Sequence, residues 1–281
     1  MKKLFSLFGL FMVILTSCSD ERDFGDTPFY QLPLNESDSI TMVKIYKAMG
    51  CESWSQKNKI DFKRRIKWPG CEFEFDSVSK EFRVSSIRFD FYDEFPEFAE
   101  PEYNIPQEIS QLPFLRDLLL FGREDLKINN IAALAGCPSL ESLYINNGNF
   151  EGKDLNEELD GLSSPLKTIT LKKSGLNGSQ DWVKRFPELE GLNLSNNNYE
   201  GKVPDIYKYC DYYVDLSDNN YSEMEWSYFT DANVKRIPNL RYNKLHGEIP
   251  EDALNSPNWL AFRPYIYYQQ KGYDYTNWDG R

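Results

Sequence analysis

Apolar residues recur along the middle of the chain in one pattern, apolar-x-x-apolar-x-apolar, followed by a polar turn and a further apolar residue. The third apolar residue falls at positions 120, 145, 171, 194, 216 and 240, so the repeat lengths are 25, 26, 23, 22 and 24 residues. The alternation predicts a short strand whose middle residue points outward. One repeat buries too little to be stable alone, so we expect the strands to stack as a parallel sheet. The clearest copies begin at Leu115, Leu140, Leu166 and Leu189.

The length and order of these copies resemble the leucine-rich-repeat family over about residues 84–250. Two copies end in an apolar-x-Gly-x-apolar-Pro run, at 199–204 and 245–250, which is similar to the plant-type subclass of that family. The resemblance implies an α/β solenoid, a right-handed coil with a parallel sheet on the concave face and short 3₁₀ or irregular return arms. Short helical turns are expected near 130–135 and 181–185.

An asparagine follows the last strand leucine by three residues in three copies. The resemblance implies that this asparagine lies inside the turn and bonds the backbone of adjacent coils. Earlier copies carry Gly148 and Ser174 at this position, which predicts a less regular ladder there. The three ladder residues are Asn197, Asn219 and Asn243.

The repeats divide the chain into parts. About seven repeats are expected over 83–254, with a surface insertion near 90–112 that is rich in Glu, Pro and aromatic residues. A small helical N-terminal cap is expected over 37–82 and an aromatic C-terminal cap over 255–281, because the ends of a solenoid expose apolar edges.

The N-terminal cap contains a Trp-x-x-Cys-x-aromatic run that resembles the cap of plant extracellular repeat proteins. The second cysteine of that cap is replaced here by Val78, so the usual disulfide cannot form. In an oxidising compartment, Cys51 is the substitute partner that we expect for Cys71. The apolar positions that fit an amphipathic helix in this cap are Ile40, Val43, Ile45 and Met49.

The chain begins with two lysines and an apolar run of twelve residues, Leu4 to Leu15, which is too short to span a bilayer but fits a signal-peptide core. The run ends in Leu-Thr-Ser-Cys, which resembles the lipobox of bacterial lipoproteins. The resemblance implies removal of residues 1–17 and a lipid anchor on Cys18. The alternative is an ordinary secretory signal with an incidental cysteine.

An acidic stretch directly follows Cys18 and resembles an export tag that places lipoproteins on the outer face of the outer membrane. We therefore expect a lipid-anchored outer-membrane protein that is exposed at the cell surface. Residues 18–36, which contain Gly25, Pro28 and Pro33, are expected to form a linker between the lipid and the folded part.

Composition narrows the class of function. The 281 residues include 32 Lys and Arg against 44 Asp and Glu, a net charge of −12, which argues against nucleic acid as a partner. The one histidine, His246, occupies a variable turn position, and the five cysteines include no Cys-x-x-Cys pair. We therefore expect a binding protein with no catalytic residues, metal or cofactor.

If the strands stack in register, their outward residues form two rows on the concave face, where the family that this chain resembles usually binds ligands. Leu119, Phe121 and Tyr144 gather toward the N-terminal end and predict contact with a protein partner. The alternative is that the 90–112 insertion folds over them. The first row is Arg88, Leu119, Tyr144, Thr170, Asn193, Asp215 and Asn239, and the second is Asp90, Phe121, Asn146, Lys172, Ser195, Ser217 and Arg241.

The last 23 residues include eight aromatic ones, which we expect to cover the final coil. Aromatic rings with polar tips also suit wet contact surfaces, so carbohydrate binding by this segment is the alternative function. The eight are Trp259, Phe262, Tyr265, Tyr267, Tyr268, Tyr273, Tyr275 and Trp278.

Overall fold

The computed structural model describes residues 32–48, 70–91, 102–208 and 213–277. Residues from Pro33 onward form one compact unit, and of the other unit, Met1–Leu32, only Leu32 is described. No helix among the described residues is long and apolar enough to cross a bilayer. The predicted signal peptide, the anchor at Cys18, Cys51, Met49 and Trp278 lie outside the described residues.

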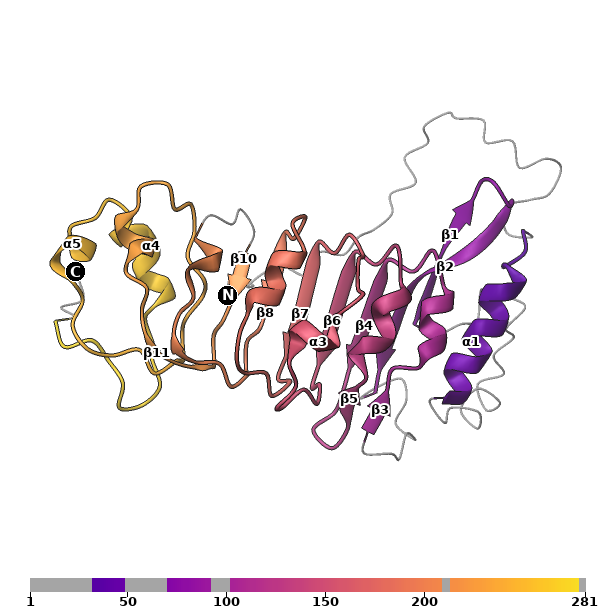
Figure 1. Cartoon of the computed structure of the whole chain (residues 1–281), viewed down its shortest axis with the longest axis horizontal. Helices are drawn as coiled ribbons and strands as arrows, with labels where there is room; N and C mark the ends of the chain where they lie inside the picture. The colour runs from indigo at the N-terminus through magenta and orange to yellow at the C-terminus, as the bar shows by residue number, and fades with distance from the viewer. Residues whose placement is uncertain (1–31, 49–69, 92–101, 209–212, 278–281) are drawn as a thin grey trace, which may run out of the picture. The chain divides into compact units, whose positions relative to one another are not determined.

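The main sheet has seven strands, and from β2 onward they lie side by side in chain order (Figure 1). Neighbours from β2 to β10 run parallel, in the single register that the repeats predict. The predicted stacking of the repeats as one parallel sheet is confirmed. The spatial order is β1 (Cys71–Asp76), β2 (Glu81–Asp90), β4 (Asp117–Phe121), β6 (Ser142–Asn146), β7 (Thr168–Lys172), β8 (Gly191–Asn193) and β10 (Tyr213–Asp215).

The first apolar residue inside each strand contributes to one continuous inner column. Leu118 pairs with Leu143, which pairs with Ile169, and Ile169 pairs with Leu192. These four side chains are at most 1% exposed, and Leu194 beyond them is fully buried. At roughly 2 kcal/mol for each fully buried aliphatic side chain, stacking of the coils supplies the main stabilisation of the fold.

The return arms are short helical turns, as predicted near 130–135 and 181–185. Two small parallel sheets join neighbouring arms, β3 (Glu102–Asn104) with β5 (Lys127–Asn129) and β9 (Glu200–Lys202) with β11 (Asn220–Glu223). The helical turns are η3 (Gln107–Gln111), η4 (Ile131–Gly136), α3 (Leu155–Glu158), η5 (Asp181–Arg185), η6 (Asp205–Tyr207), α4 (Ser227–Thr230), α5 (Glu251–Leu254), α6 (Trp259–Phe262) and η7 (Arg263–Tyr265).

The surface insertion predicted near 90–112 is wrong for residues 102–112. β3 and η3 form a regular return arm, and Ile105, Ile109 and Leu112 are at most 1% exposed. The charged and proline residues hid these three apolar positions, since a return arm has no fixed apolar period. Residues 92–101 lie outside the described part of the chain.

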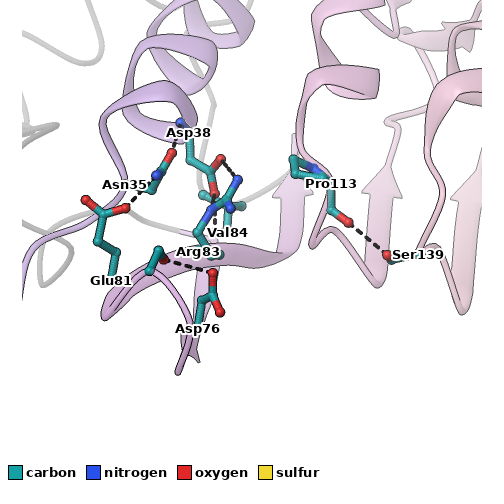
Figure 2. Close-up of polar contacts among 9 residues, drawn as sticks. Asn35, Asp38, Asp76, Glu81, Arg83, Val84, Pro113 and Ser139 are labelled. Carbon is teal, nitrogen blue, oxygen red and sulfur yellow. Dashed lines mark hydrogen bonds and ion pairs between the residues drawn. The ribbon is translucent and has the colours of Figure 1, made fainter. Parts of the chain in front are cut away.

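The N-terminal cap consists of the helix α1 (Glu36–Ala48) and of β1, which pairs antiparallel with β2. Asp38 of α1 is fully buried and receives hydrogen bonds from Arg83 Nε and Nη2, at 2.9 and 2.7 Å, and from the Val84 N–H at 2.9 Å (Figure 2). This bidentate ion pair fixes the cap to the first repeat strand.

The apolar face predicted for the cap helix needs a correction. Ile45 is buried as expected, but Ile40 is 51% exposed. The helix instead buries Asp38, Thr41 and Met42 beside Ile45, because Arg83 provides the partner that allows a carboxylate on the inner face.

A ladder of side-chain amides joins successive turns in the C-terminal half. Asn219 Oδ1 accepts a hydrogen bond from the Tyr199 N–H at 3.1 Å, and Asn219 Nδ2 donates to the carbonyls of Leu194 and Leu216, both at 3.0 Å. Such side chains satisfy backbone groups that water cannot reach. The equivalent bonds are made by Asn197 and Asn243.

The ladder is thinner at the two earlier positions. The Ser174 hydroxyl accepts a hydrogen bond from the Gly148 N–H at 3.1 Å and donates to the Lys172 carbonyl at 2.9 Å. Gly148 has no side chain to contribute. A serine hydroxyl reaches fewer backbone groups than an amide. The buried Asn147, next to Gly148, donates from its Nδ2 to the Leu126 carbonyl at 2.7 Å and so joins this turn to the preceding coil.

The ladder also continues past Asn243, into the segment predicted only as a cap over 255–281. Gln269 Oε1 accepts a hydrogen bond from the Leu245 N–H at 3.1 Å, and its Nε2 donates to the carbonyls of Leu240 and Ile266. A further coil therefore lies within the expected cap.

Backbone conformation independently marks this last coil. Each ladder residue follows a residue with positive φ, and Tyr268, before Gln269, has a φ of 59°, against 58° for Tyr242 in the coil before. Ile266 takes the buried place of Leu240. The repeat escaped prediction because glutamine replaces the asparagine and Arg-Pro-Tyr precedes Ile266 in place of a leucine pattern.

Candidate functional site

The two predicted rows of outward residues lie on one face of the main sheet, here called the sheet face. In the first row, Arg88 pairs with Leu119, Leu119 with Tyr144, Tyr144 with Thr170 and Thr170 with Asn193. The row continues through Asp215 to Asn239. In the second row, Asp90, Phe121, Asn146 and Lys172 are paired in the same way.

The N-terminal part of the sheet face carries a cluster of rings and one cation. The centroids of Phe121 and Tyr144 lie 4.6 Å apart, with the rings tilted by 30°. The Arg88 guanidinium stands 5.0 Å from the Phe121 centroid and 3.7 Å from the Asp90 carboxylate. We call Arg88, Leu119, Phe121 and Tyr144 the aromatic cluster.

The strands position this cluster. Leu118 and Leu120 point into the core, so Leu119 and Phe121 between and beyond them point outward. Tyr144 is placed in the same way by Leu143 and Ile145 on β6. The three apolar side chains are half-buried, so the cluster is prepacked and still presents ring surface.

The electrostatics of the cluster follow from its partial burial. Burial raises the pKa of the Tyr144 phenol above its ordinary value, the nearby Arg88 acts against this shift, and Asp90 adds to it. The phenol is therefore a neutral hydrogen-bond donor at physiological pH. Arg88 is exposed and adds a positive charge beside the rings.

Farther along the sheet face, polar residues bond to their own strand ends. Asn193 Oδ1 accepts from the Ser195 N–H, and Asp215 Oδ1 accepts from the Ser217 N–H, both at 2.9 Å. Arg241 Nε donates to the Pro264 carbonyl at 2.9 Å. These predicted contact residues therefore already brace the turns. The others, Asn146, Thr170 and Lys172, are half-buried on the same face.

Three residues of the aromatic tail belong to the core, as the structural interpretation expects, and three others are exposed. Trp259, Phe262 and Tyr275 are at most 8% exposed, and the first two rings pack against Phe229. Solvent reaches the rings of Tyr265, Tyr268 and Tyr273, which are 37%, 68% and 37% exposed.

The structure also places the side chains that the sequence offers for metal binding and nucleophilic chemistry. They hold no group of three or more His, Cys, Asp and Glu side chains arranged for a metal ion. His246 is exposed, and its Nδ1 lies 2.8 Å from the Lys244 carbonyl. Cys137 is a buried thiol whose pKa burial raises to about 11, which keeps it protonated and unreactive. Because Cys51 is not described, its bond to Cys71 remains a prediction.

A pocket near the C-terminal coils was not predicted. A pocket of about 270 Å³ opens at the N-terminal ends of the last strands, and two consecutive cations, Lys235 and Arg236, contribute to its lining. The signal was present in the sequence as a basic pair directly before a repeat strand in an acidic chain. Nothing in a repeat pattern shows that neighbouring arms leave a gap there.

The period, the parallel register and the amide ladder together define the fold as a solenoid of the leucine-rich-repeat type. No model of a protein family matches it. A similar curated protein is the systemin receptor SR160 of Solanum peruvianum, which is 30% identical over 126 residues, 43% of this chain and 10% of the receptor. The chain thus spans about a tenth of the length of the curated relative that it matches.

Solved structures give further, more distant similarities. A plant ice-binding protein is 21% identical with a TM-score of 0.47, covering 77% of this chain and 66% of its own. The PEPR1–AtPEP1 complex is 22% identical with a TM-score of 0.49, covering 78% and 30%. The ectodomain of the Arabidopsis receptor kinase HAESA, in complex with an IDA peptide hormone, is 17% identical with a TM-score of 0.41, covering 78% and 43%.

Proposed function

We propose that this protein is a non-catalytic recognition protein that binds a protein or peptide partner through the sheet face. The observation that carries the proposal is the aromatic cluster, in which the tilted rings of Phe121 and Tyr144 pack together beside Leu119 and Arg88 lies over one ring. Prepacked aromatic residues and arginine are the side chains that dominate binding energy at protein interfaces. The similarity to a receptor over 43% of the chain supports the same class of function.

The test is selection of peptides from a random display library on the purified protein, followed by affinity measurement of the enriched peptides. The triple variant L119S/F121S/Y144S should weaken binding at least a hundredfold, at about 2 kcal/mol for each of two anchors. A matched control, N177S/E188S, changes two exposed residues that lie off the sheet face, between β7 and β8, and should bind within a few-fold of the parent. Unchanged binding by a folded triple variant would move the site off the cluster.

We further propose that a lipid on Cys18 anchors the protein in the outer membrane and displays it at the cell surface. The support is the lipobox at the end of the apolar run and the acidic stretch after it. Mass spectrometry of the N-terminal peptide should find Cys18 acylated, and C18S should release the protein from membranes whereas C71S should not. Surface display requires that externally added protease cleave the protein on intact cells. An unmodified Cys18 would end the anchor proposal.

The alternative, carbohydrate binding through the aromatic C-terminal segment, is favoured by the exposure of Tyr268. Trp259, Phe262 and Tyr275 are buried in the core and are not offered to a ligand. This alternative predicts that a neutral oligosaccharide found by glycan screening binds the protein and that Y268A weakens its binding. The absence of any neutral glycan ligand would reject it.

A further inference from the structure

The pocket beside Lys235 and Arg236 lies apart from the aromatic cluster. It forms where three successive coils pass from return arm to strand, around Tyr213, around 235–238 and around Tyr265. Tyr213 begins β10, and Asp215, at the other end of that strand, pairs with Asn239. β10 and the aromatic cluster strand β6 are separated by β7 and β8, about 14 Å of sheet at ordinary strand spacing.

Two tyrosine rings provide accessible aromatic surface at this pocket. Tyr213 is 48% exposed and Tyr265 is 37% exposed. Burial, followed by the Asp215 carboxylate 3.4 Å away, raises the pKa of Tyr213 to about 12, so its phenol is neutral. The floor is apolar, with Val214 and Ile237 at most 6% exposed. Amphipathic rings over an apolar floor suit a ligand with one apolar face and several hydroxyl groups.

The charge of the pocket is opposite to that of the chain. Among the residues that the structure describes, its lining contains Lys235 and Arg236, both exposed, and no carboxylate, although the chain carries a net charge of −12. Among the described residues, Arg236 makes no hydrogen bond or ion pair. The nearest carboxylate named above, Asp215, lies outside the lining and accepts the Tyr213 hydroxyl. A planar guanidinium with no such partner is suited to binding a ligand carboxylate.

We propose that this pocket binds one acidic sugar residue, with the ring against Tyr213 and Tyr265 and the carboxylate at Arg236. The volume of about 270 Å³ is near the lower end for small-molecule sites, so it fits a single ring with its substituents. This ligand differs from that of the carbohydrate alternative in being anionic, and its site is the pocket rather than the surface around Tyr268. It does not depend on protein recognition by the aromatic cluster.

The test compares trigalacturonic acid with its methyl ester by titration calorimetry at low salt. The two probes share their shape and hydroxyl groups and differ in charge. The acid should bind at least about tenfold more tightly than the ester, and R236Q should remove most of that difference. R185Q, which removes one positive charge from a return arm, is the matched control and should bind like the parent. Y265A should weaken both probes by several-fold.

Four outcomes would overturn the proposal. They are a lack of saturable binding of the acid, equal binding of acid and ester, equal losses in R236Q and R185Q, or tighter binding of a glutamate-rich peptide than of the sugar at the same site. The L119S/F121S/Y144S variant separates the two proposals, because it should leave acid binding unchanged while it abolishes peptide binding. Thermal unfolding of each variant verifies that the coils remain intact.

Discussion

The N-terminal and C-terminal coils differ in the length of their strands and in the side-chain hydrogen bonds that join their turns. Strands β4, β6 and β7 have five residues each, whereas β8 and β10 have three, and the next pairing is a single bridge between Asp215 and Asn239. The amide ladder shows the opposite trend, since Gly148 and Ser174 stand where Asn197 and its successors follow. The backbone hydrogen bonds of the sheet continue past the short strands, for example from the Leu194 N–H to the Asp215 carbonyl at 2.8 Å. The side-chain amides of the C-terminal coils therefore add to this backbone pairing at the turns.

This difference also separates the two candidate sites. The aromatic cluster stands on the long, regular strands, where the alternation of inward and outward residues holds for five positions. The pocket lies among the short strands, where adjoining arms diverge enough to leave a gap. A regular sheet therefore presents a surface, and the less regular coils present a cavity.

The largest expected effect is a loss of stability at the N-terminal cap, which closes the end of the long-stranded coils. D38A would leave Arg83, with its side chain 13% exposed, and the Val84 N–H without their buried partner. We expect a loss of about 4 kcal/mol in the free energy of unfolding, measured by urea denaturation. R116Q, which breaks an exposed pair with Glu74, is the control and should cost less than about 1 kcal/mol. A D38A variant as stable as R116Q would show that the cap is held elsewhere.

The next largest effect is a loss of stability in the C-terminal coils, where the asparagine ladder joins the turns. N219A would strand the Tyr199 N–H and the carbonyls of Leu194 and Leu216 inside the protein. The expected loss is about 3 kcal/mol, with faster amide hydrogen exchange at Tyr199. N198A removes an exposed amide with one long bond to Gly175 and should be nearly neutral. Equal stabilities of the two variants would contradict the structural role of the ladder.

A smaller loss of stability is expected at Ser174, which occupies the ladder position in an earlier coil. S174A removes one acceptor for the Gly148 N–H and should cost about 1 kcal/mol, less than N219A. The measurement is again urea denaturation, with hydrogen exchange at Gly148 as the local readout. If S174A costs as much as N219A, the serine position contributes as much to stability as the asparagine positions do.

The smallest effect is a pH dependence in the C-terminal arms. Hydrogen bonds from Lys202 and Ser227 lower the pKa of Glu225 from 4.5 to about 2. Because the folded pKa is lowered, this stabilisation is present above pH 4.5 and is lost as the pH falls from 4.5 toward 2. E225Q should flatten that part of the stability curve slightly, since Lys202 is 54% exposed and water screens the pair. If E225Q lost stability between pH 4.5 and 2 as steeply as the parent, this assignment would be contradicted.

The sequence was most informative where packing imposes a period. Leu118, Leu143, Ile169 and Leu192 could be predicted as one buried column, and this set the register of every outward residue, including Phe121 and Tyr144. The approach of those two rings could also be expected, because outward neighbours on adjacent strands lie within reach of each other.

Features that depend on a specific partner could not be predicted. The inner position of Asp38 requires Arg83, which lies 45 residues away. The buried residues of 102–112 and the coil closed by Gln269 follow no leucine period, because hydrogen bonds define them as much as burial does. The pocket depends on the gap between coils, a distance that no single repeat encodes.

Gln269 has a practical consequence for anyone who shortens this protein. A boundary drawn where the asparagine motif stops, after Leu254, would remove the groups that bond the Leu245 N–H and the Leu240 carbonyl. It would also uncover Phe229, whose ring rests against Trp259 and Phe262. A shortened chain should therefore keep Asn277, whose side chain bonds the Ile249 backbone, because a chain that ends earlier would expose apolar side chains and unpaired backbone groups.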